Sequence, residues 1–281
     1  VKRDAVSEKL FEAACRTRTD NSVEPKVFIL AWTTTPWTLP ANTGLAVGKN
    51  IPYQLISTFN SYTFESIHVV LAKALVGRYF NEKGAAVPLE GYAEGDHKVL
   101  PWRLEGEFIG TDLINIKYER LFDFTPFEGE ERAFRVINGD FVTTEDGTGI
   151  VHISPTFGAD DFRAAQLADI PALMVPDAEG TLGPIVDRTG RYVPQMGEFA
   201  GRWVKNYDGH DESGADYKTL DESIVIKMKG DGTAFKVEKY EHTYPHCWRT
   251  DKPVLYYPLD SWFIKTTAVK DRLIELNKTI N

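Results

Sequence analysis

Apolar residues gather in short runs along this chain, and polar stretches separate the runs. Runs rich in β-branched and aromatic side chains predict strands over residues 27–32, 53–57, 68–71, 114–118, 134–137 and 150–153. Apolar residues at helical spacing are fewer and predict helices over residues 72–80, 160–167 and 220–229, with Gly230 at the expected helix stop. Residues 10–15 fit a short helix or an extended segment. This pattern favours a mainly β fold with peripheral helices, in the α+β class.

The last predicted element is a helix within residues 266–280, with Thr267 as the expected cap. The apolar residues near a helical period there are Val269, Leu273, Leu276 and Ile280. Such a face needs an apolar partner, which we expect in a part of the protein outside this sequence.

Composition bounds the size of the fold and its surroundings. A chain of 281 residues with 42% hydrophobic content can bury a core as one large domain, or as one domain with an appendage. The sequence has no apolar run near the roughly 18 residues that a membrane span needs, and no secretory signal at its start. Cys15 and Cys247 are too few for a disulfide framework. We therefore expect a cytoplasmic protein with reduced thiols and no membrane contact.

The formal net charge of -9 argues against a general nucleic-acid-binding module, because phosphate contacts require a basic surface. It is compatible with a protein that holds only the end of a nucleic acid.

The segment 31–42, AWTTTPWTLPAN, carries the first candidate chemistry. Thr33, Thr34 and Thr35 follow an apolar run, and Pro36 fixes the backbone after them. Three hydroxyl groups at the end of a strand can orient a water molecule and a ribose in an adjacent cleft. On local chemistry alone, an edge strand whose hydroxyls stabilise a turn remains an alternative.

The segment 146–162, DGTGIVHISPTFGADDF, carries the second candidate site. Its glycines permit a close approach of the backbone, His152 lies at a strand end, and Asp160 and Asp161 open a helix. One imidazole and one carboxylate could then face a common cleft. In the alternative reading, an aspartate only caps the helix and His152 only packs in the core. The segment is not a phosphate loop, because no lysine follows the glycines.

Together the two segments resemble the editing (CP1) domain of isoleucyl-tRNA synthetases, in the class I aminoacyl-tRNA synthetase family. The resemblance extends through residues 196–201 (MGEFAG), 244–249 (YPHCWR) and 261–263 (SWF). Valyl and leucyl relatives carry Thr-Arg-Pro in place of Thr34-Thr35-Pro36, and valyl enzymes typically have lysine at the position of His152. These positions favour the isoleucine branch over a valyl or leucyl editing domain. Thr34, His152 and Asp161 also argue against a tRNA-binding or structural module whose active site has decayed.

The resemblance implies a distorted β-barrel-like domain, normally inserted in a Rossmann-type catalytic domain. Residues 1–22 would be the inbound connection, residues 23–240 the editing domain, and residues 241–281 the outbound connection and helix. The sequence has no HIGH-type or KMSKS-type signature, so the aminoacylation site is expected elsewhere. ATP and Mg²⁺ would serve that missing domain, and we expect no cofactor in this fragment.

The activity implied by the resemblance is that of an aminoacyl-tRNA deacylase. It would hydrolyse the ester of mischarged valyl-tRNA(Ile), with valyl-adenylate as a second candidate substrate. Its partners would be the 3′ end of isoleucine tRNA carrying valine and the rest of the parent synthetase. Such a second site is needed because one methylene is worth only about 1–3 kcal/mol in a pocket, a limit for which isoleucyl enzymes are the standard example.

The resemblance also assigns roles to individual residues. Asp161 would bind the α-ammonium group of the valyl moiety, and Thr33, Thr34 and Thr35 would hold the adenosine, the ester and the attacking water. Trp32 and His152 would shape the side-chain pocket, with Asn42 as a support.

This chain departs from the family pattern at two places. Many bacterial members have Gly-His at Thr156-Phe157, so no role of that second histidine carries over. In some members the Cys-Trp-Arg segment continues into another cysteine and helps to bind zinc, whereas here Arg249 is followed by Thr250 and Asp251. We therefore predict no metal, with His246 and Cys247 packing near the domain base.

Overall fold

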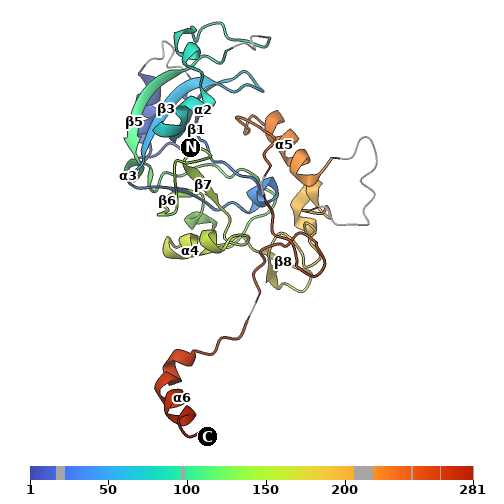
Figure 1. Ribbon diagram of the computed structural model, residues 1–281. Coiled ribbons are helices and arrows are strands. Elements are labelled where there is room, and N and C mark those ends of the chain that lie inside the picture. The colour runs from blue at the N-terminus through green and yellow to red at the C-terminus, as the bar shows by residue number, and fades with distance from the viewer. Residues whose placement is uncertain (17–22, 96–98, 206–217, 242, 260, 281) are drawn as a thin grey trace.

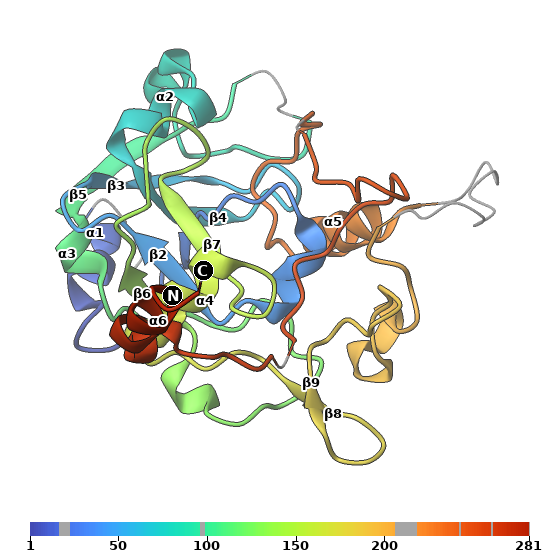
Figure 2. The same cartoon turned by 60° about the horizontal axis from the view of Figure 1, so that its bottom comes forward.

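The computed structural model describes residues 1–16, 23–95, 99–205, 218–241, 243–259 and 261–280 (Figures 1 and 2). The α-helices of these residues are α1 (Glu8–Cys15), α2 (Val76–Tyr79), α3 (Gly110–Leu113), α4 (Ala159–Leu167), α5 (Leu220–Gly230) and α6 (Lys270–Asn277). Short 3-10 helices lie between them: η1 (Pro36–Ala41), η2 (Lys73–Leu75), η3 (Glu82–Ala86), η4 (Glu130–Arg132), η5 (Pro194–Phe199) and η6 (Thr266–Val269).

The described strands form three mixed or antiparallel sheets. They are β1 (Val27–Ile29), β2 (Gly44–Val47), β3 (Pro52–Phe59), β4 (Ser66–Ala72), β5 (Arg103–Ile109), β6 (Arg135–Asn138), β7 (Ile150–Ile153), β8 (Val175–Pro176) and β9 (Leu182–Gly183). The strand orders are β1-β4-β3-β5, β6-β2-β7 and β8-β9. The α+β class is confirmed, but the described strands do not close into the expected barrel.

The central strands of the largest sheet, β3 and β4, are buried on both faces, which explains their nearly continuous apolar runs. On one face Tyr53 and Leu55 join a core to which α1 contributes Leu10 and Phe11. On the other face the core is built around Phe80 and neighbouring apolar residues of β3 and β4. The helix at the start of the chain is therefore part of the fold.

The large sheet and the sheet of β6, β2 and β7 meet at the chain that leaves β1. Trp32 pairs with Val151 of β7 in a parallel bridge, and its N–H donates to the carbonyl of Ile150 at 3.4 Å. Tyr53 ties the sheets again, because its hydroxyl accepts from the N–H of Gly48 at 3.0 Å and donates to the carbonyl of Gly149 at 2.8 Å. The threonine segment thus begins where the two sheets join.

Four of the predicted strands are confirmed as β3, β4, β6 and β7. The strand predicted over residues 27–32 ends at Ile29, and Trp32 keeps only its bridge to Val151. The strand predicted over residues 114–118 is wrong. Asn115 has a left-handed backbone (φ 69°), which breaks the extended run, and Lys117 makes only an isolated bridge to Arg135.

The predicted helices at residues 160–167 and 220–229 are confirmed as α4 and α5, and Gly230 is the last residue of α5. The helix predicted over residues 72–80 is divided into η2 and α2. Thr267 is not a helix cap, because it lies inside η6, and Val269 occupies the position before α6. Figure 1 shows α6 standing away from the body, and all its residues are exposed. None of the described helices has the length and apolar character needed to cross a membrane.

Candidate functional site

The three consecutive threonines lie between the Trp32 bridge and η1, where the backbone turns sharply. The N–H of Thr35 donates to the hydroxyl of Thr33 at 3.0 Å, and the two hydroxyl oxygens are 3.3 Å apart. The Thr38 hydroxyl donates to the carbonyl of Thr35 at 2.9 Å. Thr34 is partly buried, and its hydroxyl has no hydrogen-bond partner among the described residues. Its neighbours therefore fix the turn, while the donor and the acceptor of the Thr34 hydroxyl stay unused among the described residues.

His152 of β7 lies against the first turn of η1. Its Nε2 is 3.1 Å from the Thr38 hydroxyl and its Nδ1 is 3.5 Å from Nδ2 of Asn42. Asn42 is held in turn, because its Oδ1 accepts from the Tyr118 hydroxyl at 2.6 Å. All four side chains are buried. A continuous chain of hydrogen bonds thus joins the threonine turn to the second segment.

The partners of Asn42 orient its amide group and favour one tautomer of His152. Nδ2 of Asn42 donates to the carbonyl of Gly44 at 2.8 Å and lies 3.4 Å from the carbonyl of Ile153, so the amide group has only one sensible orientation. An NH₂ group then faces Nδ1 of His152 at 3.5 Å, which favours an unprotonated Nδ1 and a proton on Nε2 beside Thr38. Burial lowers the pKa of His152 to about 4. The imidazole is therefore neutral near pH 7 and has no free lone pair toward solvent.

Asp161 lies in the first turn of α4 and reaches back to the loop before it. Its Oδ2 accepts from the N–H of Ser154 at 2.9 Å, two residues after His152. Its Oδ1 has no hydrogen-bond partner among the described residues. Burial raises the pKa of Asp161 to about 6, against the lowering effect of the Ser154 N–H, and Asp160 raises it further. Asp161 thus holds the loop, and its free oxygen favours a cationic partner.

Trp32 forms one wall beside β7. Gly147 has φ 68°, and a Cβ at that position would lie 3.1 Å from the Trp32 ring. The Tyr240 ring packs edge-on against Trp32, with centroids 5.3 Å apart. The glycine is therefore required both by its left-handed backbone and by the close approach of the indole.

The structure joins some of the predicted site residues directly and others only through the backbone. Thr33, Thr35, His152 and Asn42 belong to one hydrogen-bonded chain. Within the described residues Asp161 forms no hydrogen bond to the three threonines, and it is tied to His152 through the short stretch to Ser154. Thr38 and Tyr118 belong to the network and were missed. Thr38 is signalled by its spacing from Thr35, whereas nothing in the sequence points to Tyr118.

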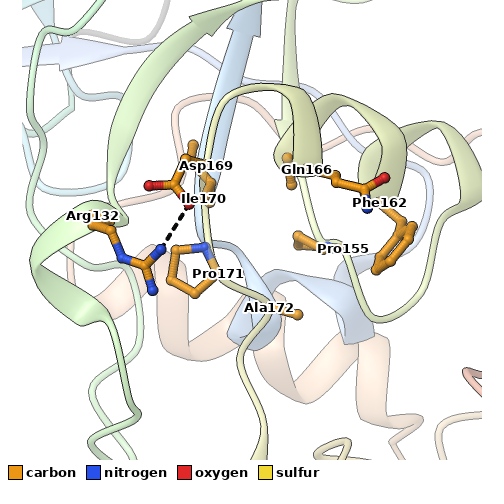
Figure 3. Close-up of a pocket in the computed structure, with 9 residues that line it drawn as sticks. Arg132, Pro155, Phe162, Gln166, Asp169, Ile170, Pro171 and Ala172 are labelled. Carbon is orange, nitrogen blue, oxygen red and sulfur yellow. Dashed lines mark hydrogen bonds and ion pairs between the residues drawn. The ribbon is translucent and has the colours of Figure 1, made fainter.

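A separate hollow of about 230 Å³ lies on another side of α4 (Figure 3). Phe162 and Gln166 of α4 line it, and an ion pair of Arg132 and Asp169 at 2.8 Å borders it. It contains none of the predicted site residues. The hollow is therefore distinct from the threonine and histidine site.

No group of three or more His, Cys, Asp or Glu side chains within the described residues is placed to hold a metal ion. Nδ1 of His246 lies 2.9 Å from the carbonyl of Tyr244, and Cys247 is a free, partly buried thiol.

Comparison with known proteins places this chain in a family. No family profile matches the chain. It is 58% identical over 263 residues to the isoleucine–tRNA ligase of Cytophaga hutchinsonii, an alignment of 90% of this chain and 23% of that protein. It is 53% identical over 271 residues to the isoleucine–tRNA ligase of Bacteroides fragilis, and 35% identical over 301 residues to that of Wolbachia pipientis wMel.

The chain belongs to the isoleucine–tRNA ligase family. It spans about a quarter of the length of these relatives, 23% of the first two and 25% of the third. Its fold is similar to the crystal structure of GlLeuRS-CP1, with a TM-score of 0.52 at 17% identity over 85% of this chain and 93% of that one. The expected relationship to the CP1 editing domain is thus confirmed for the family and for the fold.

Proposed function

We propose that this chain is an editing hydrolase that cleaves the ester between valine and the terminal adenosine of isoleucine tRNA. The observation that carries the proposal is the position of a buried, neutral His152, which is hydrogen-bonded to Thr38 beside the threonine turn. In that turn the Thr34 hydroxyl has no hydrogen-bond partner among the described residues. A neutral imidazole engaged at both ring nitrogens, beside ordered hydroxyls, supports a site that positions an ester and a water.

Asp161 supplies the charge that this substrate requires. The α-ammonium group of an aminoacyl ester is cationic, and the Oδ1 of Asp161 is free to accept from it. Binding an ammonium group restores a favourable environment to a carboxylate whose pKa burial has raised to about 6. Asp161 is accordingly an anchor for the amine, not the base that activates water.

His152 and Trp32 would bound the space for the substrate side chain. Because Nδ1 of His152 faces an amide NH₂ group and the pKa is about 4, the ring is a poor proton acceptor at neutral pH. Its role is then to limit size, which would admit valine and exclude the longer isoleucine. Water would attack the ester carbonyl, and the products would be free valine and tRNA with a free 3′-terminal hydroxyl.

The wider setting follows from the family. We propose that the rest of the parent synthetase, including a Rossmann-type catalytic domain using ATP and Mg²⁺, supplies most contacts to the tRNA body. The formal charge of -9 on this chain agrees with that division, because it offers little basic surface. Valyl-adenylate, which carries the same ammonium and side chain, is a second candidate substrate of the same site.

Release of labelled valine from valyl-tRNA(Ile) tests the proposal. The wild-type chain should release valine faster than the uncatalysed ester, and Asp161→Ala should remove the acceleration while the protein still melts cooperatively. Asp160→Ala is the matched control, because Asp160 is exposed on the same helical turn. An active Asp161→Ala variant would show that the anchor role is wrong, and an inactive wild type would contradict the proposed activity.

A further inference from the structure

Two side chains from outside the site hold the backbone of Trp37, the second residue of η1. The N–H of Trp37 donates to Oδ1 of Asp221 at 2.9 Å, and its carbonyl accepts from the hydroxyl of Tyr192. Asp221 lies in the first turn of α5, 184 residues along the chain, and Tyr192 is fully buried beside η5. The N–H and the carbonyl of Trp37 are thus both hydrogen-bonded to side chains that are distant in the sequence.

Asp221 is itself supported by a cation. Nζ of Lys205 lies 3.6 Å from its Oδ2 and faces the rings of Trp37 and Tyr244, 6.0 and 4.7 Å from their centroids. Burial raises the pKa of Asp221, and Lys205 and the Trp37 N–H act against that rise. A largely buried ion pair of this kind contributes little net stability, because desolvation offsets the attraction. The Asp221 side chain nevertheless contacts Trp37, which lies in the same segment as the threonine turn.

Trp37 connects the two halves of the candidate site. Its ring packs edge-on against Phe157, with centroids 5.0 Å apart, and Phe157 lies in the loop between Ser154 and Asp161. The next residue along the chain, Thr38, is the hydrogen-bond partner of His152. A shift of Trp37 would therefore displace the threonine turn relative to both His152 and the loop that carries Asp161.

We propose that Asp221 is a positioning residue for hydrolysis at this site, acting through Trp37 to fix the threonine turn against the Asp161 loop. The inference rests on the proposed editing function and extends it to a residue that contacts no substrate. Loss of the contact should lower kcat much more than it changes KM, because the groups that bind the ammonium and the side chain remain present. A misplacement near 1 Å can reduce a rate by about 100-fold, so we expect a loss of about 10-fold to 100-fold.

Three variants separate positioning from simple destabilisation. Asp221→Ala removes the acceptor, and Asp221→Asn keeps an oxygen for the Trp37 N–H. Glu222→Ala is the control, because Glu222 caps the same turn of α5 through Thr219, at 2.8 Å from the Thr219 N–H, and forms no hydrogen bond to η1 within the described residues. Each variant is assayed for kcat and KM on valyl-tRNA(Ile), for thermal unfolding, and for hydrogen exchange at the Trp37 amide.

The expected result is a large fall in kcat and faster exchange of the Trp37 amide in Asp221→Ala, with most activity retained in Asp221→Asn and Glu222→Ala. Full activity of a folded Asp221→Ala, or equal losses in Asp221→Ala and Glu222→Ala at equal melting temperature, would overturn the inference. If Asp221→Ala does not fold, Asp221→Ser removes the same carboxylate with a polar side chain in its place, and an unchanged kcat in that variant would overturn the inference. An inactive wild-type chain would instead count against the proposed function, while the exchange measurement still reports whether Asp221 protects the amide.

Discussion

His152 and Asp161 are both buried ionisable groups, and burial moves their pKa values in opposite directions. It lowers the pKa of His152 to about 4 and raises that of Asp161 to about 6. In each case burial favours the uncharged form. For His152 the hydrogen bonds to Thr38 and Asn42 fit that form, whereas Asp161 keeps one oxygen without a partner among the described residues. A fully hydrogen-bonded, uncharged His152 fits the proposed role of limiting the pocket. A carboxylate with a free oxygen fits the proposed role of Asp161 in binding the ammonium group.

Asp161→Asn should stabilise the protein in a pH-dependent way. The folded pKa of about 6 lies above the ordinary 3.8, so ionisation of Asp161 lowers the free energy of unfolding as pH rises from about 3.8 to 6, and the loss is constant above that range. Asparagine avoids this loss and can still accept from Ser154. The gain should reach about 3 kcal/mol at pH 7.5 and about half of that at pH 5, as measured by urea unfolding. A gain that is equal at both pH values would contradict the raised pKa.

His152→Ala should change which ester the site accepts. Removing the imidazole opens space beside Thr38 and Asn42, so hydrolysis of valyl-tRNA(Ile) should persist in part while isoleucyl-tRNA(Ile) begins to be hydrolysed. The readout is the ratio of the two deacylation rates in variant and wild type. An equal loss of both activities would mean that His152 acts in the chemistry or holds the site together, and an unchanged ratio would remove it from the pocket.

The sequence motifs could predict part of the candidate site because its residues are close together along the chain. Thr33 to Thr35, and His152 with Asp161, lie within two short segments, and each segment keeps its own local geometry. Tyr118 and Asp221 could not be predicted, because they meet Asn42 and Trp37 only through tertiary packing, 76 and 184 residues apart. Such contacts leave no local pattern in one sequence.

At the scale of elements, apolar strands buried on both faces were predicted well and short or polar strands were missed. β2 has only four residues and begins with Gly44, and β5 includes charged residues because parts of it face solvent. The predicted strand near Asn115 failed because β-propensity does not register a single left-handed residue. The junction between the sheets depends on another such residue, Gly149, with φ 72°.

Gly149→Ala should destabilise the protein strongly. The added Cβ would lie 2.4 Å from Cβ of Ala72, and the backbone there also accepts from the Tyr53 hydroxyl. Overpacking of a core typically costs about 1–3 kcal/mol, and the left-handed conformation adds about 1–2 kcal/mol. Gly180→Ala is the matched control, because Gly180 has φ 82° with open space around it, so only the conformational term applies. Equal shifts in melting temperature for the two variants would show that the contact with Ala72 is unimportant.

At the scale of the whole molecule, the described body and the C-terminal segment differ in how they are packed. The hydrophobic clusters draw on residues from Val1 to Leu255, whereas Trp262, Phe263 and the residues of α6 are exposed. Figure 2 shows α6 in front of the body when the lower end is turned forward, at the end of an extended connection. Apolar side chains on such a segment contribute nothing to the core of this chain.

Truncation after Leu259 should therefore leave thermal unfolding unchanged. Loss of exposed side chains away from the core changes stability by less than about 0.5 kcal/mol. The comparison is the melting temperature of the truncated and the complete chain at equal protein concentration. A drop of several degrees would show that α6 packs on the body in solution.

Discrimination between two esters that differ by one methylene is the central property proposed for this site. The decisive measurement is single-turnover deacylation of valyl-tRNA(Ile) and isoleucyl-tRNA(Ile) by the same preparation, with protein in excess because a chain of net charge -9 should bind tRNA weakly. We predict rapid release of valine and a much slower release of isoleucine, close to the uncatalysed rate. Equal release of both amino acids, or release of neither above the uncatalysed rate, would contradict the account.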